Sequence, residues 1–338
     1  MECNQLGVGD LFRMADQFHD SALLHFAHSS GLFELTTEAR DTNELAARMG
    51  WVPRKALIFL NSLVAIGLLL KDDQGCYRNT LVADGSLVKS QPGYMGGVIE
   101  HQRKQWDTWT LIGDNLCAQK TLPWHQEQKL GSDADANEAF HEAMRNLARA
   151  NLPAFLSLPI PRGKKHVIDM AGSHGVYLAA MAQAEAELTG EVWDLPGAER
   201  LALQTFREFD CSQRCCFRVK DITQPASFAA AHANIVMLND CLHYFEPEMV
   251  RDILARAIDV LAPHGILIIA TQLLNSDGVS PAAAAGFSMH MMLNTANGGL
   301  HVTSWIAELI THMGLSVTQE PLDPTKRYVV LLGQKNRH

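Results

Sequence analysis

The 338-residue sequence lacks an apolar run long enough to cross a bilayer. Its most apolar stretch, Ala56 to Leu70, is interrupted by Asn61 and Ser62, and it is shorter than the roughly 20 residues that a spanning helix needs. The first 20 residues carry acidic and polar side chains where a secretory signal has a basic start and an apolar run. We therefore expect no membrane partner and a cytoplasmic protein.

The sequence also lacks an excess of positive charge. It has 28 Lys and Arg against 37 Asp and Glu, which gives a formal net charge of -9. Tracking of a polyphosphate backbone depends on clustered Lys and Arg that release counterions. Nucleic acid is therefore not an expected partner.

Cysteine pairs with metal-binding spacing are absent. The chain has seven cysteines, an odd number, and none forms a Cys-x-x-Cys pair. Cys211, Cys215 and Cys216 cluster, but no His-x-His or second pair completes a zinc site. We expect free thiols and no metal.

Residues 1–105 show helical apolar spacing with short breaks. Asp41 offers a helix start, and Pro53 opens a second helix that runs to Gly67. A hairpin signal follows at 68–79, with its turn at Asp72 to Gly75. Helix, helix, hairpin is the pattern of a winged helix, but the recognition-helix position has almost nothing basic to meet phosphate. A structural, dimerising role is favoured over DNA binding.

Residues 106–163 are expected to form connecting helices or a lid, and Pro159, Pro161 and Gly163 mark the boundary that follows. From Lys165 onward strands and helices alternate, which is typical of a parallel sheet with crossover helices. The predicted strands are 166–171, 189–194, 217–220, 233–240, 265–273, 315–321 and 327–334. The short link Asp323-Pro324-Thr325 leaves no room for a crossover, so the last two strands should be antiparallel. The prediction for 164–338 is an α/β, Rossmann-like domain with a mostly parallel seven-stranded sheet.

Three successive strand ends carry glycine or acidic residues. The strand ending at Met170 runs into Ala171-Gly172-Ser173-His174-Gly175, where small residues allow close approach of a ligand. Asp194, about 20 residues on, can accept hydrogen bonds from ribose hydroxyls. Asp221 can meet the adenine amino group while Ile222 covers the ring. Each acid alone is as readily a helix cap, but together they favour a nucleoside site.

The glycine turn separates two kinds of nucleoside cofactor. A dinucleotide needs Gly-x-Gly-x-x-Gly to seat its pyrophosphate at the helix start, and Ala-Gly-Ser-His-Gly does not fit that spacing. S-adenosyl-L-methionine is the expected cofactor.

With these motifs the sequence resembles, over nearly its whole length, the plant-type small-molecule O-methyltransferases. This family includes caffeic acid and acetylserotonin methyltransferases and their bacterial natural-product relatives. The family's Asp-x-Gly-Gly-Gly-x-Gly motif falls on Asp169 to Gly175 with two glycines replaced, and its Asp-Leu-Pro motif is intact at 194–196. The resemblance implies cofactor contacts by Asp169, Gly172, Gly175, Asp194, Leu195, Asp221, Ile222 and Asn239.

The resemblance also places His243 on the family's catalytic histidine. The strand 233–240 leads into it, and a helix, Pro263-His264-Gly265 and another strand follow as in the family. Methyl transfer to a hydroxyl needs alignment and removal of a proton, which a neutral imidazole can accept. We expect His243 to be the base, with His301 nearby.

The departures from the family bear on mechanism. Its two glutamates beside the histidine correspond to Thr271, or Gln272 after a one-residue shift, and to His301, while a common lysine is Asn239. Without a carboxylate to orient it, His243 should be a poorer base. Either the acceptor is already acidic, or His301 assists, or the reaction is not methyl transfer to a phenol.

The helix around 287–294 corresponds to the one that lines the acceptor pocket in the family. Its methionine and aromatic residues predict an adaptable apolar wall, although the same spacing also suits core positions. The predicted acceptor-binding residues are Trp106, Met144, Phe287, His290, Met291 and Asn294.

We therefore predict an enzyme, a homodimeric S-adenosylmethionine-dependent O-methyltransferase of secondary metabolism, acting on a small aromatic or conjugated molecule. Dimerisation is implied by the resemblance and supported by apolar residues of an early helix, Leu23, Leu24, Phe26 and Phe33. The alternatives are a non-methylating reaction of hydroxylase or pericyclase type, methylation at N or C, and a DNA-binding regulator.

Overall fold

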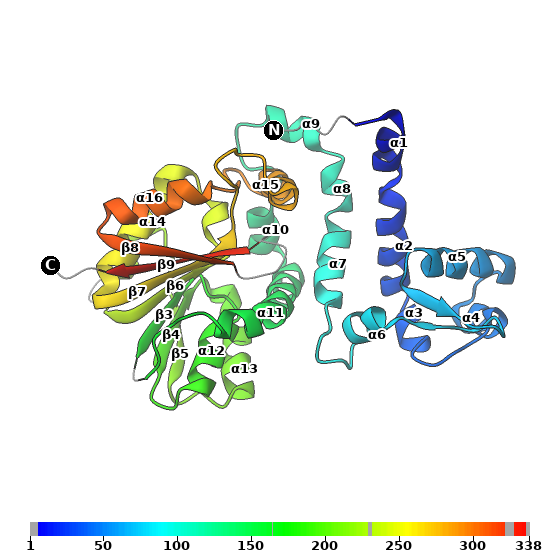
Figure 1. The fold of residues 1–338 in the computed structure, drawn as a ribbon, viewed down its shortest axis with the longest axis horizontal. Coiled ribbons are helices and arrows are strands. Elements are labelled where there is room, and N and C mark those ends of the chain that lie inside the picture. The colour runs from blue at the N-terminus through cyan, green and yellow to red at the C-terminus, as the bar shows by residue number, and fades with distance from the viewer. Residues whose placement is uncertain (1–5, 164, 229–231, 322–327, 336–338) are drawn as a thin grey trace. The chain divides into compact units, whose positions relative to one another are not determined.

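The computed structural model describes residues 6–163, 165–228, 232–321 and 328–335. The chain forms two compact units, Met1–Lys104 and Gln105–His338. Figure 1 labels most of their helices and strands.

The first unit is helical with one small hairpin. Its elements are α1 (Val8–Asp16), α2 (Phe18–Ser29), α3 (Leu32–Leu35), α4 (Thr42–Met49), α5 (Pro53–Ala65), β1 (Leu69–Lys71), β2 (Tyr77–Asn79), α6 (Leu81–Leu87) and α7 (Gly96–Lys104). The Asp41 carboxylate accepts the amides of Asn43 and Glu44 at 2.7 and 2.9 Å, which caps α4 as predicted. The hairpin β1–β2 is antiparallel, as its turn sequence indicates.

The winged-helix pattern is completed by a third extended segment at Arg40. Its backbone exchanges hydrogen bonds with that of Tyr77, at 2.8 and 3.1 Å. The α5 helix turns Leu60 and Leu63 into the core of this unit and leaves Leu57 and Ile58 exposed. The predicted helix–helix–hairpin order is therefore confirmed.

The second unit begins with helices and continues as an α/β domain. Its helices are α8 (Trp106–Trp109), α9 (Ile112–Cys117), α10 (Gln126–Ser132), α11 (Ala134–Leu156), α12 (Val176–Ala184), η1 (Pro196–Ala198), α13 (Glu199–Glu208), η2 (Pro225–Phe228), η3 (Leu242–Tyr244), α14 (Pro247–Val260), α15 (Ala282–Asn294) and α16 (Thr303–His312). Its strands are β3 (His166–Met170), β4 (Thr189–Asp194), β5 (Cys215–Val219), β6 (Ala233–Asn239), β7 (Leu261–Gln272), β8 (Leu315–Pro321) and β9 (Tyr328–Lys335).

The strands form one sheet in the order β5-β4-β3-β6-β7-β9-β8. Strands β3 to β7 are parallel, and β9 runs antiparallel to both β7 and β8, as predicted for the last pair. The Asp323-Pro324-Thr325 link lies outside the described residues. Strands β4 and β5 are added on one side of β3, and β6 and β7 on the other. The order of strand addition therefore reverses between β3 and β6, and open α/β sheets bind ligands at such a switch point.

Two strands begin earlier than the sequence suggests: β5 starts at Cys215 and not at 217, and β7 shows the larger difference. We predicted a start at 265, but β7 begins at Leu261, which pairs with Ala233 before a shift in register lets Ile266 pair with Ile235. His264 in this irregular stretch has φ +62°. The proline, histidine and glycine there mark a bulge inside the strand and not its beginning.

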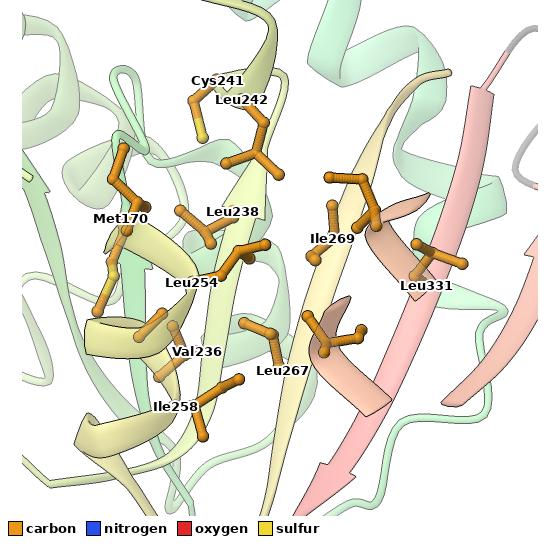
Figure 2. Close-up of a cluster of buried hydrophobic side chains, with 14 of the residues drawn as sticks. Met170, Val236, Leu238, Cys241, Leu242, Leu254, Ile258, Leu267, Ile269 and Leu331 are labelled. Atoms are coloured by element: carbon orange, nitrogen blue, oxygen red, sulfur yellow. The ribbon is translucent and has the colours of Figure 1, made fainter. Parts of the chain in front are cut away.

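Alternate residues of the central strands fill two apolar layers. Figure 2 shows one layer, in which Met170, Val236 and Leu238 of the sheet meet Leu254 and Ile258 of α14. On the opposite face, Val167, Ile235 and Met237 pack against residues of α11, α12 and α13. Helices cover both faces, as a parallel sheet requires, so ligands can approach the sheet only at its edges.

None of the helices in the described ranges has both the length and the apolar character needed to span a bilayer.

Candidate active site

The strand register brings two of the predicted side chains, Asp194 and Asn239, to the same edge of the sheet as the turn after β3. Met170 pairs with Trp193 of β4 and with Leu238 of β6. Asp194 and Asn239 are the next residues along these neighbouring strands, so they flank the turn that follows β3 at its carboxyl edge.

That turn has an unusual backbone. Ala171 and Ser173 have φ values of +53° and +44°, in the left-handed region that favours glycine, and Gly175 has +66°. Ala171 and Ser173 are the two positions of the family motif at which this sequence replaces glycine. A Cβ on Gly172 would lie 2.5 Å from the carboxyl carbon of Asp169, so this position has no room for a side chain.

Asp169 lies beneath the turn with only 1% of its surface exposed. Neither of its carboxyl oxygens has a hydrogen-bond partner among the described residues. Burial, followed by the charge of Asp194, raises the pKa of this carboxyl to about 8. Because a buried carboxyl without donors is costly, the site suits a ligand that supplies them.

Asp194 ties the β3 turn to the β4 turn. Its two oxygens accept the backbone amides of Ser173 at 2.8 Å and Leu195 at 2.6 Å. Burial raises the pKa of this carboxyl, and the two amides oppose the rise. Each oxygen retains acceptor capacity toward hydroxyl groups of a ligand. The Leu195 side chain is exposed.

Asp221 and Ile222 follow β5 on the far side of β4. One Asp221 oxygen accepts the amide and the hydroxyl of Thr223 at 2.9 and 2.7 Å, so it closes its own turn. Ile222 is buried in the apolar layer that contains Trp193, and the Lys220 ammonium lies 3.5 Å from the centre of the Trp193 ring.

Asn239 ends β6 with a buried side chain. Neither its amide oxygen nor its amide nitrogen has a partner in the part of the chain that the structure describes. Asn239 and Asp169 thus both present unpaired polar groups near the β3–β6 junction.

His243 lies in η3, four residues after Asn239, and is 4% exposed. Its Nδ1 is 3.5 Å from the Thr271 hydroxyl, and the Phe287 ring contacts it edge-on at a centroid distance of 5.1 Å. Burial, followed by the charges of His301 and His290, lowers the pKa of His243 to about 3. The imidazole is therefore neutral at physiological pH.

His301 and Gly299 hold the backbone around His243. The His301 Nε2 is 3.1 Å from the carbonyl oxygens of both Leu242 and Phe245, so this nitrogen carries its proton and donates to them. The Gly299 amide donates to the His243 carbonyl at 2.9 Å. This places His301 as a brace of η3.

Helix α15 supplies an aromatic wall beside His243. Phe287 stacks on His290 at 5.6 Å with an interplanar angle of 13°. The side-chain Nδ2 of Asn294 donates to the backbone carbonyl of His290 at 3.0 Å. The side-chain Oδ1 of Asn294 is buried and has no partner among the described residues. Met291, on the same helix, is buried.

The other predicted acceptor contacts come from the helices before β3. Trp106 is partly exposed on α8, which packs against α15. Met144 is half-buried on α11.

Sequence reasoning missed one contact of the turn. His141 of α11 is hydrogen-bonded to the Ser173 hydroxyl at 2.6 Å, and burial lowers the pKa of His141 to about 4. The available signal was the spacing of His141 and Met144, which share a helix face.

Across the described residues, no three His, Cys, Asp or Glu side chains gather closely enough to hold a metal ion. Cys211, Cys215 and Cys216 are free thiols, as predicted.

The seven-stranded order, the ligand edge at the β3–β6 junction and the acidic strand ends define an S-adenosylmethionine-dependent methyltransferase. A family model described as "O-methyltransferase domain" matches residues 122–316, which is more than half of the chain. The chain belongs to this family, and it is an enzyme that uses S-adenosylmethionine.

Individual relatives agree along most of the chain. A 3-hydroxy-5-methyl-1-naphthoate 3-O-methyltransferase from Streptomyces sahachiroi is 29% identical over 293 residues, or 83% of each chain. A solved O-methyltransferase family protein from Burkholderia thailandensis is 38% identical, covers 98% of each chain and has a TM-score of 0.88. Human N-acetylserotonin methyltransferase, solved in complex with SAM, is 18% identical with a TM-score of 0.85 over the full length of both chains, and shares the fold.

Proposed function

We propose that this O-methyltransferase methylates a hydroxyl of a small, flat aromatic or conjugated metabolite of secondary metabolism in the cytoplasm. The observation that carries the proposal is a pair of buried polar side chains, Asp169 and Asn239, that have no hydrogen-bond partner among the described residues and lie beside a turn with no room for a side chain at Gly172. These residues fit a cofactor that brings its own donors and acceptors to the sheet edge.

The cofactor, when bound, supplies a methyl group on a positively charged sulfur. In this proposal Asp169 and Asn239 contact its polar amino-acid portion, and Gly172 and Gly175 let the backbone approach it closely. Asp194, with Leu195 beside it, accepts from the ribose hydroxyls, and Asp221 and Ile222 meet the adenine. The amides that already bind Asp194 keep its oxygens in place before the ribose arrives.

His243 is the proposed catalytic residue because it is the polar side chain of η3 that faces the aromatic wall of α15. Its neutral imidazole has one N–H donor and one acceptor nitrogen, so it can orient the acceptor hydroxyl. Alignment of the acceptor is the main contribution required of the protein, because the transferred carbon is already activated.

The acceptor pocket is proposed to include Phe287, His290, Met291 and Asn294 of α15, with Trp106 and Met144. The stacked Phe287 and His290 rings offer a flat surface. This suits a fused aromatic acceptor like the hydroxynaphthoate named for the Streptomyces sahachiroi relative.

We further propose a homodimer formed through residues 1–105, with 106–163 as a lid over the 164–338 domain. Helix α1 buries none of its residues within the chain, and Leu11, Phe12 and Met14 are each more than half exposed. Such a surface is typical of a face covered by a second copy. Light scattering should give the mass of two chains, and the mass of one chain would contradict this part.

The reaction is tested with methyl-labelled S-adenosylmethionine and a panel of hydroxynaphthoates, with mass analysis and NMR of the product. We expect the label on a phenolic oxygen. Label on nitrogen or carbon, or a converted product without label, would replace O-methylation by one of the alternatives.

A further inference from the structure

Around the proposed acceptor, the described titratable side chains near His243 are other histidines. A histidine that removed a proton would instead need a carboxylate beside it. His243 is the polar group that faces the aromatic wall, and three elements surround it: β7 with Thr271, α15 with Phe287 and His290, and the segment that carries Gly299 and His301. A histidine that acts as a base needs a group that stabilises its protonated form, and a carboxylate on the second nitrogen is the usual one.

No side chain described around His243 supplies that stabilisation. The polar atom facing its Nδ1 is the Thr271 hydroxyl, at the long distance of 3.5 Å. The titratable groups that act on it are His301 and His290, and protonation of either would disfavour a positive charge on His243. Burial, followed by the charge of Asp240, raises the pKa of the nearby Cys241 thiol, and the hydrogen bond of the His243 ring within the described residues goes to Thr271 and not to Asp240.

The two imidazoles near His243, those of His301 and His290, already have other contacts. His301 uses its Nε2 proton to hold the carbonyls of Leu242 and Phe245. His290 is stacked on Phe287, and burial lowers its pKa to about 4. A proton taken from an acceptor hydroxyl would therefore stay on a buried imidazole surrounded by other imidazoles, which is unfavourable.

A neutral imidazole in this position suits a different task. The Thr271 hydroxyl can donate to Nδ1, which leaves the ring proton on Nε2. No described residue is bonded to Nε2, so its N–H can donate to an oxygen in the pocket. An anionic oxygen accepts such a bond about twice as strongly as a neutral one.

We infer that the acceptor binds as an oxyanion that is already formed at neutral pH, and that His243 donates a hydrogen bond to it and does not remove a proton. The substrate class is a hydroxyl made acidic by conjugated carbonyl groups, such as a hydroxyquinone or another vinylogous acid. The inference rests on the proposed function and names its substrate class.

The step balances without a protein base. The acceptor oxyanion forms the C–O bond with the methyl carbon, the S–C bond breaks, and its electron pair stays on sulfur as a neutral thioether. The negative and positive charges cancel, which suits the described side chains in contact with His243, namely Thr271, Tyr244 and Phe287, none of which is a carboxylate.

The test compares two bicyclic acceptors that carry the hydroxyl at the same ring position. Lawsone, a hydroxynaphthoquinone, is anionic at neutral pH, whereas β-naphthol is a neutral phenol. A phenol with a pKa near 10 is roughly 0.1% ionised at pH 7, so we expect kcat/KM for β-naphthol to be on the order of 100-fold or more below that for lawsone. Absorbance spectra of each acceptor bound in the presence of S-adenosylhomocysteine should show the anion of lawsone and the neutral form of β-naphthol.

Thr271→Glu adds the carboxylate that the site lacks, and Thr271→Gln is the matched control without charge. General base catalysis contributes about 10²-fold or more, so T271E should raise kcat/KM for β-naphthol at least about tenfold and leave that for lawsone within about a factor of two. T271Q should raise neither. If T271E does not fold, the wild-type comparison still decides the inference.

The outcomes separate the inference from the function on which it rests. If the wild type has kcat/KM values for the two probes that differ by less than about tenfold, the inference is overturned and O-methylation stands. A bound lawsone spectrum in the protonated form would also overturn it. Absence of labelled methyl on either probe would count against the proposed function, and the inference would fall with it.

Discussion

The two halves of the proposed site differ in the titratable groups that they contain. The cofactor half, at the ends of β3, β4 and β6, contains the carboxyls of Asp169 and Asp194. The acceptor half, around η3 and α15, contains the imidazoles of His243, His290 and His301, which burial keeps neutral. The cofactor half therefore offers carboxyls to a positively charged ligand, whereas the acceptor half adds no positive charge of its own.

The halves also differ in how they are held in place. Backbone amides fix Asp194, and a turn with two non-glycine residues in the left-handed region surrounds Asp169. His243 is instead held through its own backbone, by His301 and Gly299. Variants should therefore separate cofactor binding from turnover.

The largest expected effect comes from closing the space above Asp169. In Gly172→Ala the new Cβ would lie 2.5 Å from the Asp169 carboxyl carbon, so the turn must shift. We expect the affinity for S-adenosylhomocysteine, measured by calorimetry, to fall about 100-fold. Gly131→Ala is the control, because nothing lies within 4 Å of the added carbon there. Unchanged affinity in G172A would show that the cofactor does not need this turn.

The second prediction uses opposite pH dependences of the two halves. The folded-state pKa of Asp169 is about 8 against 3.8 for the free group, so its contribution to the ligand-free protein's stability is full at low pH and is lost as pH rises from about 4 through 8. The folded-state pKa of His290 is about 4 against 6.5, so its contribution is present above pH 6.5 and is lost as pH falls toward 4.

Denaturant unfolding as a function of pH checks this prediction. D169N should remove the loss of stability between about pH 4 and 8, a few kcal/mol at about 1.4 kcal/mol per pKa unit, and H290Q should remove the loss that occurs as pH falls from 6.5 toward 4. If both variants retain the wild-type profile, the charges assigned to the two halves are wrong.

The third prediction concerns the brace of η3. His301→Ala removes the donor to Leu242 and Phe245, and the resulting misplacement of His243 should lower kcat about tenfold without changing the affinity for S-adenosylhomocysteine. His301→Gln keeps an N–H donor and should recover part of kcat. His312→Ala, at an exposed helix end, is the control. Loss of cofactor affinity in H301A would mean that the two halves are not separable.

The smallest effects concern backbone strain in the cofactor half. Ala171→Gly should stabilise the protein by about 1 kcal/mol because the left-handed conformation costs Ala about that amount. Ser173→Ala keeps the strain and loses the bond to His141, so it should destabilise by about 1 kcal/mol, with S173G in between. Thermal unfolding measures the series, and equal melting temperatures would show that the turn is relaxed.

The sequence predicts the sheet well because its strands are apolar and are followed by glycine or polar residues. Asp194 and Asn239 follow directly after buried strand residues, and parallel register then places them beside Ala171. The start of β7 at Leu261 could not be predicted, because a bulge lets the strand continue through residues that normally end one. The antiparallel pairing of β8 with β9 followed from the short link between them.

The side-chain interactions of the site were less accessible. The bond between His141 and Ser173 joins residues 32 positions apart, and it depends on how α11 packs near the β3 turn. The use of His301 as a donor to two carbonyls depends on the path of the backbone after α15, whereas the family resemblance matched His301 to a glutamate beside the catalytic histidine. The positive φ values at Ala171 and Ser173 could not be predicted from the residue types, because Ala and Ser rarely adopt positive φ.

Calorimetric titration of S-adenosylhomocysteine into the wild-type protein tests the central claim most directly. We expect one cofactor per chain, with uptake near pH 7 accompanied by release of a proton from Asp169 that is absent in D169N. Folded protein that gives no binding heat at several temperatures, or proton release that persists in D169N, would contradict it.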